Sequence, residues 1–266
     1  LLSMGCECDS GAVDGTTPLH VACSGPGRLE VARTLLEHGA AVNTGDASRR
    51  TACLLAAEHG LWRTLRLLAL HGANPDLCDA HGRAPVLAAA AHGHTAAVST
   101  LLTTLGCNPD LADASGQVAA HVAAASGHVK VLRELRRRCG ASLATVDRDG
   151  AQPLHLAALH GHVECVRVLL GTEGAGVRVD AVVAATGRTA LHLAAAQGLP
   201  EVVATLLEEG RAQRDLLDVH GNTPLLLGVQ GGHLRVTQAL LQGVAVGTSD
   251  VHQAAGGGAS VPNAQA

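Results

Sequence analysis

Histidine and cysteine are the residue types in this 266-residue chain that could bind metal or act as nucleophiles, with sixteen of the first and eight of the second. His92 with His94, and His160 with His162, have the H-x-H spacing that can bind a metal ion on a strand. Each pair straddles a glycine at which a helix is expected to end, and no carboxylate or cysteine completes a ligand set. We therefore predict a structural role for both pairs and no metal site.

The cysteines do not form a recognisable framework. Cys6 and Cys8 are close together, and the others are scattered between Cys23 and Cys165. A disulfide scaffold would suit a short secreted chain, and a zinc site would require paired C-x-x-C units. We interpret the cysteines as reduced thiols that serve as small apolar residues in an intracellular protein. A redox sensor is the alternative.

One combination could give a thiol nucleophile, because Glu58 and His59 follow Cys53 closely. Cys53, however, occupies a leucine-type position in an apolar run, and a buried thiol is usually inert. The chain has no G-x-S-x-G elbow, P-loop or Rossmann fingerprint, and we interpret 25–27 as a turn. The sequence therefore predicts no enzyme and no cofactor.

The composition indicates a regular helical architecture. Apolar residues make up 47% of the chain, yet it has no Phe and no Tyr, and Trp62 is its only aromatic residue. A core of Leu, Val and Ala suits helices stacked at close range, whereas globular cores usually rely on bulky aromatic rings.

Charge and hydropathy exclude several classes of function. A formal net charge of −4 argues against a general nucleic-acid binder. No apolar stretch of about 18 residues predicts a membrane span, and the N-terminus does not resemble a signal peptide. Because the chain does not begin with Met, we expect it to be part of a longer protein.

A short motif recurs along the chain. Its copies are T-P-L-H-V-A at 17–22, Q-P-L-H-L-A at 152–157, T-A-L-H-L-A at 189–194 and, more loosely, V-A-A-H-V-A at 118–123. Glycines upstream of the motif lie 34 residues apart, as at 82, 116 and 150. A second series, at 60, 93, 127, 161, 198 and 232, has steps of 33, 34, 34, 37 and 34.

The motif contains the signals of a helix-turn-helix unit. A threonine such as Thr189 precedes the apolar run, where its hydroxyl can accept a hydrogen bond from free helix-start N–H groups. A proline such as Pro153 follows at about the first helical position. The central glycine, such as Gly161, ends the first helix because it accepts left-handed angles. Val163, Val166, Leu169 and Leu170 have the spacing of an amphipathic second helix.

These residues resemble the ankyrin repeat, whose outline is followed most closely by 147–175, and the resemblance extends over roughly 9–247. It implies an all-α ankyrin-repeat solenoid of about seven helix-turn-helix units with short hairpin loops. The expected array occupies 1–247, followed by a disordered Gly/Ala-rich tail at 248–266. The expected repeats are approximately 9–45, 46–78, 79–112, 113–146, 147–180, 181–217 and 218–247.

The resemblance also assigns most histidines to the scaffold. It implies that His20, His121, His155 and His192 tie one unit to its neighbour, and that His94, His128, His162 and His233 belong to the repeat outline. Some units depart from the pattern. Leu54 and Leu87 replace the motif histidine, 24–27 and 171–176 contain insertions, and the last unit, 223–229, is apolar where a terminal cap should be polar.

Partner-binding residues are expected at the loop tips and at the ends of the first helices, along the concave side of the solenoid. At the tips these are Arg49, Arg50, His81, Arg83, Ser115, Gln117, Arg148, Gln152, Arg188, His220 and Asn222. At the helix ends they are Glu58, His59, His92, Ser126, His160, Gln197 and Gln230. Their Arg and His content favours an acidic or polar partner segment.

The leading functional hypothesis is a non-enzymatic scaffold or adaptor, cytoplasmic or nuclear, that binds a protein and no small-molecule substrate. The alternatives are the targeting arm of an enzyme or channel and a ubiquitin-ligase substrate receptor, although no SOCS box is visible in 248–266. The charge run at 133–138 is interpreted as a solvated helix face, with a localisation signal or an acidic-partner patch as alternatives. Asn43 resembles ankyrin asparagines that are hydroxylated.

Overall fold

The computed structural model describes residues 8–139, 143–171 and 177–242. Within these ranges the chain is helical, and its one extended pairing is an isolated bridge between Gly45 and Thr51. The all-α prediction is therefore confirmed.

The helices of the first four units are α1 (Pro18–Cys23), α2 (Leu29–Glu37), α3 (Ala52–Glu58), α4 (Trp62–Leu70), α5 (Pro85–Ala91), α6 (Thr95–Thr100), η1 (Leu101–Leu105), α7 (Ala119–Ala125) and α8 (Val129–Cys139). Those that follow are α9 (Pro153–Leu159), α10 (Val163–Leu170), α11 (Ala190–Ala196), α12 (Pro200–Glu208), α13 (Pro224–Gln230) and α14 (Leu234–Gln242).

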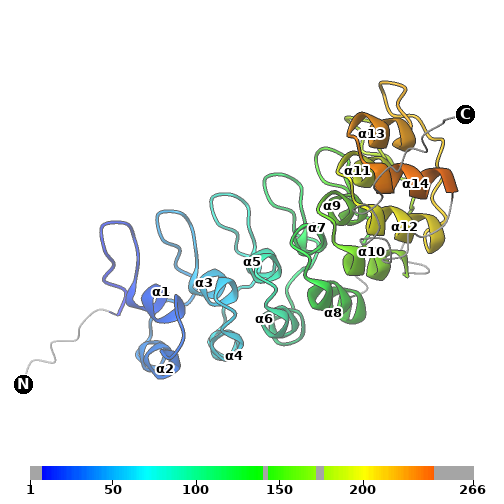
Figure 1. Ribbon diagram of the computed structural model, residues 1–266. Coiled ribbons are helices and arrows are strands. Elements are labelled where there is room, and N and C mark those ends of the chain that lie inside the picture. The colour runs from blue at the N-terminus through cyan, green and yellow to red at the C-terminus, as the bar shows by residue number, and fades with distance from the viewer. Residues whose placement is uncertain (1–7, 140–142, 172–176, 243–266) are drawn as a thin grey trace, which may run out of the picture.

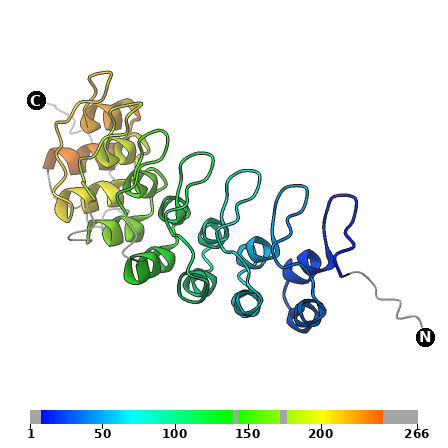
Figure 2. The same ribbon diagram turned by 180° about the vertical axis from the view of Figure 1, so that it is seen from behind.

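The helices form two rows. The first helices of the units, α1, α3, α5, α7, α9, α11 and α13, stack in one row beside the loops, and their partners form the second row (Figure 1). The loops that precede the first helices project from the same side of the array, and Figure 2 shows this arrangement from behind. The array curves toward the loops. We call the side formed by the loops and the first helices the concave face.

Local signals set the helix starts as predicted. The hydroxyl of Thr51 accepts a hydrogen bond from the N–H of Leu54 at 3.2 Å, and the hydroxyl of Thr223 accepts one from Leu226 at 3.2 Å. Proline occupies the first turn of α1, α5, α9 and α13, where a missing N–H costs nothing.

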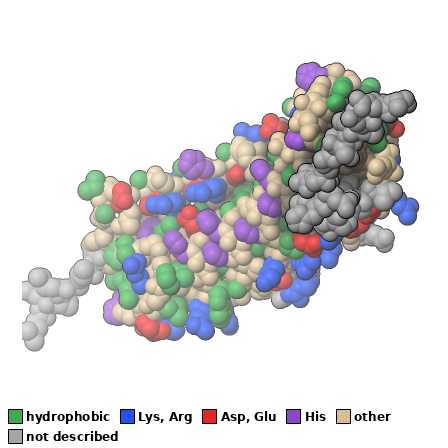
Figure 3. Space-filling view, in the orientation of Figure 1, with side chains coloured by type: hydrophobic (Ala, Val, Ile, Leu, Met, Phe, Trp, Pro, Cys, Tyr) green, Lys and Arg blue, Asp and Glu red, His purple; other side chains and the backbone are tan. Residues whose placement is uncertain are grey.

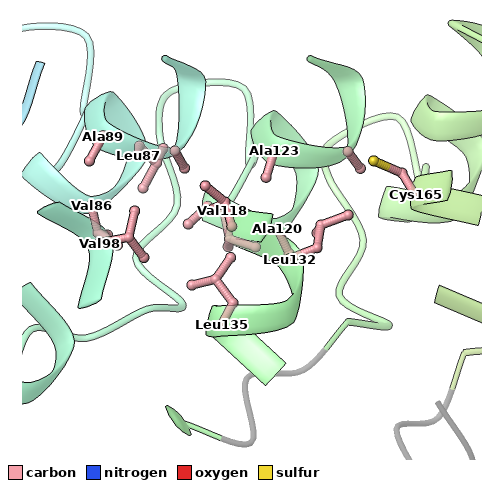
Figure 4. Close-up of a cluster of buried hydrophobic side chains, with 14 of the residues drawn as sticks. Val86, Leu87, Ala89, Val98, Val118, Ala120, Ala123, Leu132, Leu135 and Cys165 are labelled. Atoms are coloured by element: carbon pink, nitrogen blue, oxygen red, sulfur yellow. The ribbon is translucent and has the colours of Figure 1, made fainter. Parts of the chain in front are cut away.

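A single core of small and branched apolar side chains runs through the array (Figure 4). Leu87 and Val98 of one unit, Val118 and Leu135 of the next, and Cys165 of the unit after that belong to the same buried cluster. Each unit thus covers the apolar face of its neighbour, which a single unit could not do alone. Trp62 is not part of this core, because 37% of it is exposed.

The α6–η1 segment contains a π-helical turn that the sequence analysis did not anticipate. Gly106 is the thirteenth residue after Gly93, whereas Gly72 is the twelfth residue after Gly60. The extra residue is accommodated as a π-helical stretch, Leu101–Leu105, because such a turn holds one more residue than an α-helical turn.

Two sequence predictions lie outside the described residues: the effect of the insertion near 172–176 and the disorder of the tail at 248–266. The apolar character of the last unit can be assessed on its described part. Leu226, Val229, Leu234 and Leu241 are exposed by 42%, 55%, 68% and 65%, so α13 and α14 present apolar side chains at the end of the described array.

Candidate partner-binding face

The motif histidines His121, His155 and His192 join neighbouring units through hydrogen bonds. The Nε2 of His155 lies 2.8 Å from the carbonyl oxygen of Ala181, and that of His121 lies 3.0 Å from the carbonyl oxygen of Ala151. The Nδ1 of His155 accepts a hydrogen bond from the backbone N–H of Gln152 at 2.9 Å. A ring that accepts at Nδ1 and donates at Nε2 is neutral. Burial also lowers the pKa of all three rings, even though the carbonyl contacts oppose this effect.

A second set of histidines, which follow the central glycines, locks each unit against the one before it. The Nε2 of His162 lies 3.0 Å from the carbonyl oxygen of Ala125. Its ring lies directly over Gly127, where an added Cβ would be 2.7 Å from Nδ1. His94, His128 and His233 make the same bond to Glu58, Ala91 and Ala196. Both sets of histidines are therefore structural, as the repeat resemblance implies.

In the H-x-H pair of His92 and His94, one ring nitrogen of each histidine contacts a backbone carbonyl oxygen. The rings of His92 and His94 stack with centroids 5.9 Å apart. The Nδ1 of His92 contacts the carbonyl oxygen of Ala88 at 3.0 Å, while the Nε2 of His94 contacts that of Glu58 at 3.1 Å. Among the residues that the structure describes, no group of three or more His, Cys, Asp or Glu side chains is placed to hold a metal ion.

Cys53 lies in the core, where its surroundings do not favour the thiolate form. It is 1% exposed, and burial raises the pKa of its thiol to about 12. At neutral pH the group is therefore protonated and a poor nucleophile. Burial likewise raises the pKa of Cys23 to about 12 and that of Cys165 to about 11, so these cysteines serve as small core residues.

Three arginines of the predicted contact set are held by buried aspartates. A guanidinium nitrogen of Arg50 lies 2.8 Å from Asp46, one of Arg83 lies 2.8 Å from Asp79, and one of Arg188 lies 3.3 Å from Asp218. Burial alone would raise the pKa of the Asp79 carboxyl, but hydrogen bonds from Arg83 and from the N–H of His81 lower it. The arginine side chains remain 30–41% exposed, so each can shape the loop and still meet a partner.

Asn222 resembles these arginines, because its side-chain amide donates to both carboxylate oxygens of Asp218 at 3.2 Å. Glu58 and Gln117 are half-buried. The remaining predicted contact residues except Gln152 are exposed, namely Arg49, His59, His81, His92, Ser115, Ser126, Arg148, His160, Gln197, His220 and Gln230. Figure 3 shows histidine side chains spread along the face of the array turned to the viewer.

The structure leaves Gln152 little surface for the predicted partner contact, because only 7% of the residue is exposed. It occupies the position before α9 that threonine fills before α3, α11 and α13. Its Nε2 donates to the carbonyl oxygen of Ala144 at 3.0 Å, while its buried Oε1 has no hydrogen-bond partner. Gln152 is therefore part of the scaffold.

We predict that Gln152→Thr raises the free energy of unfolding by about 1 kcal/mol, because it removes an unpaired buried oxygen and supplies a helix cap. Urea unfolding followed by circular dichroism measures this change. Gln117→Thr, at a half-buried loop position, is the control and should change stability by less than about 0.5 kcal/mol. A loss of stability in Gln152→Thr would contradict the assignment.

Between the first two units the concave face has a hollow of about 320 Å³. The predicted residues Arg50, Glu58 and His59 line it together with Val21 and Leu55. Val21 and Leu55 are not among the predicted contact residues. Val21 is 49% exposed, and the equivalent Val122, Leu156 and Leu193 of later units are half-buried. All directly follow the motif histidine or its replacement, which is the signal that could have identified them.

Comparison with known families decides the classification. A family model described as ankyrin repeats in three copies matches residues 1–79, 53–147, 86–181 and 154–250. The chain belongs to the ankyrin-repeat family. Ankyrin repeats are a protein–protein interaction fold and are typically non-catalytic.

The ankyrin-repeat array is also similar to a solved structure described as the ankyrin repeat domain of Bcl-3, a unique member of the IkappaB protein family. The two share 30% sequence identity with a TM-score of 0.72, over 86% of this chain and 99% of the Bcl-3 domain. Comparison with curated proteins gives no match. In the described part of the array, no helix is both long enough and apolar enough to span a membrane.

Proposed function

We propose that this chain is a non-enzymatic scaffold or adaptor that binds a segment of a partner protein along its concave face. The observation that carries the proposal is that some polar residues of the array hold the units together while others remain exposed. The histidines that follow the central glycines are engaged between units, whereas exposed side chains at the loop tips and first-helix ends remain available along the array.

The exposed set favours a polar or acidic partner segment with some apolar side chains. Arg49 and Arg148 supply positive charge, the exposed rings of His59, His92 and His160 supply polar nitrogens, and Val21 offers apolar contact. The proposal includes no cofactor, small-molecule substrate or nucleic acid, in keeping with the net charge of −4. The proposal includes an intracellular location, because Cys23, Cys53 and Cys165 are buried in the core as thiols and not as disulfides within the described residues.

The proposal predicts that negative charges introduced at successive loop tips weaken the binding of the partner. Residues 1–247 would be used for affinity purification with mass spectrometry, followed by affinity measurement with each isolated partner. The variant His81→Glu/Ser115→Glu/Arg148→Glu should weaken binding at least tenfold, or about 1.4 kcal/mol. Arg83 is left intact because it holds the buried Asp79.

The matched control is Lys130→Glu/Arg136→Glu on α8, which changes charge on exposed residues of the second row. Partner affinity should be unchanged in this control. Equal affinity of the loop-tip variant and the unmodified chain for every captured partner would refute binding at the concave face.

A further inference from the structure

A second surface feature lies on the opposite side of the array, across α2 and α4. It is a hollow of about 360 Å³, which we call the outer groove. Trp62, Arg63, Arg66 and Leu70 line it from α4, and Leu29 and Arg33 line it from α2. Figure 3 shows basic and hydrophobic side chains next to each other over these two helices.

The outer groove has two large apolar side chains that face solvent. Trp62 and Leu70 are 37% and 83% exposed. The positions equivalent to Leu70 in the other units are polar or small, namely Glu37, Thr103, Arg137, Gly171, Glu208 and Gln242. The positions equivalent to Trp62 are Leu29, Thr95, Val129, Val163, Pro200 and Leu234, none of them aromatic. The repeat therefore accounts for an apolar residue at the Trp62 position, but neither for its aromatic ring nor for a large apolar side chain at Leu70.

The charged side chains that line the outer groove are all positive. Arg33, Arg63 and Arg66 line it, and none of its described lining residues carries a carboxylate. The guanidinium carbon of Arg63 lies 5.0 Å from the centre of the Trp62 ring, within the range of a cation–π contact. Arg33 also pairs with Glu30 at 3.2 Å on α2. Tryptophan and arginine are the residues most often dominant in protein interfaces.

We propose that the outer groove binds an acidic peptide segment that carries apolar side chains. One large apolar side chain lies against Trp62 and Leu70, and carboxylates of the peptide pair with Arg63 and Arg66. A hollow that extends from α2 across α4 to Thr104 of η1 suits a peptide chain better than a flat bilayer. Because the concave face lies on the other side of the array, this site allows two partners to be held at once.

The chain provides its own probe of this site, because Trp62 is its only tryptophan and it has no tyrosine or phenylalanine. Random twelve-residue peptides displayed on phage would be selected on the unmodified chain and, in parallel, on Arg66→Glu. Selected peptides without tryptophan would then be synthesised and titrated while Trp62 emission is recorded. Melting curves would confirm that each variant is folded.

The proposal expects peptides enriched in Asp and Glu with interspersed apolar residues, and a blue shift of Trp62 emission on binding. Arg66→Glu and Leu70→Glu should each weaken binding at least tenfold. Arg133→Glu, at the position equivalent to Arg66 on α8, should leave binding unchanged. The triple loop-tip variant should also leave it unchanged, which separates failure of this site from failure of the concave face.

Several results would overturn the proposal. One is selection of peptides without acidic enrichment, and another is binding that leaves Trp62 emission or the Arg66→Glu affinity unaltered. A shift of Trp62 emission by phosphatidylserine vesicles but not by peptides would indicate a membrane surface instead. A concentration-dependent shift with dimerisation in sedimentation would indicate a second copy of the chain.

Discussion

Gly127→Ala should destabilise the array by about 3 kcal/mol, whereas Gly72→Ala should cost only about 1 kcal/mol. The two glycines have nearly the same left-handed backbone, with φ values of 75° and 78°. Their surroundings differ. A Cβ at Gly72 would meet nothing within 4 Å, whereas one at Gly127 would lie 2.7 Å from Nδ1 of His162. The comparison thus separates the cost of backbone conformation from the cost of breaking the contact between units.

The excess cost at Gly127 has a specific origin. To relieve the clash, the His162 ring must move and lose its 3.0 Å bond to the carbonyl oxygen of Ala125. Because stability in a repeat array depends on the contacts between neighbouring units, weakening one of them lowers cooperativity as well. We expect the urea transition of Gly127→Ala, measured by circular dichroism, to broaden or split.

A double-mutant cycle tests this origin directly. His162→Ala removes the ring with which the new Cβ collides, so Gly127→Ala/His162→Ala should be less destabilised than the sum of the single variants by more than about 1 kcal/mol. Strict additivity would contradict the proposed contact, and equal costs for Gly127→Ala and Gly72→Ala would do the same.

The second large effect is a loss of stability in mild acid. Burial lowers the pKa of His121, His155 and His192 below the ordinary value of 6.5 in the folded chain. As pH falls through 6.5, the unfolded chain takes up protons that the folded chain does not bind. Stability is therefore full above this pH and declines below it, toward the lowered folded pKa. Each such ring contributes a slope of up to about 1.4 kcal/mol per pH unit. The three rings together contribute a slope of up to about 4 kcal/mol per pH unit.

The carboxylates act in a separate range of pH. The folded pKa values of Asp46 and Asp79 are lowered from 3.8 because hydrogen bonds outweigh the cost of burial. Their contribution to stability is present above about pH 4 and is lost as pH falls below it. Loss of stability between pH 6.5 and 5 therefore reports on the histidines.

Urea unfolding at a series of pH values between 8 and 5 measures this effect. His155→Leu copies the leucine that Leu54 and Leu87 place at the same position, and should reduce the slope by up to about 1.4 kcal/mol per pH unit. Gln197→Leu, at an exposed first-helix end, changes no titratable group, so it is the control and should not alter the slope. An unchanged slope in His155→Leu would show that this ring is not held neutral by burial.

Sequence alone determined the repeat and the helices, because the signals that specify them are local. The prolines of the first turn, the threonine caps and the left-handed glycines act within a few residues, so reading them required no knowledge of the neighbouring unit. The motif histidines were likewise assigned correctly, since the repeat itself fixes their surroundings. The π-helical turn at 101–105 was present in the sequence only as one extra residue, and its location depended on how α6 packs.

Only the tertiary structure decided which polar residues are available, because exposure depends on how the next unit stacks. Gln152 is a polar residue at a position predicted to be a loop tip, yet it is buried at the start of α9. Arg188 finds its carboxylate thirty residues later, on Asp218 of the following unit. The outer groove also depends on the tertiary structure. The sequence shows one tryptophan and scattered arginines, and the packing of α2 beside α4 brings them together. Side chains from separate helices become neighbours only when the helices pack against each other.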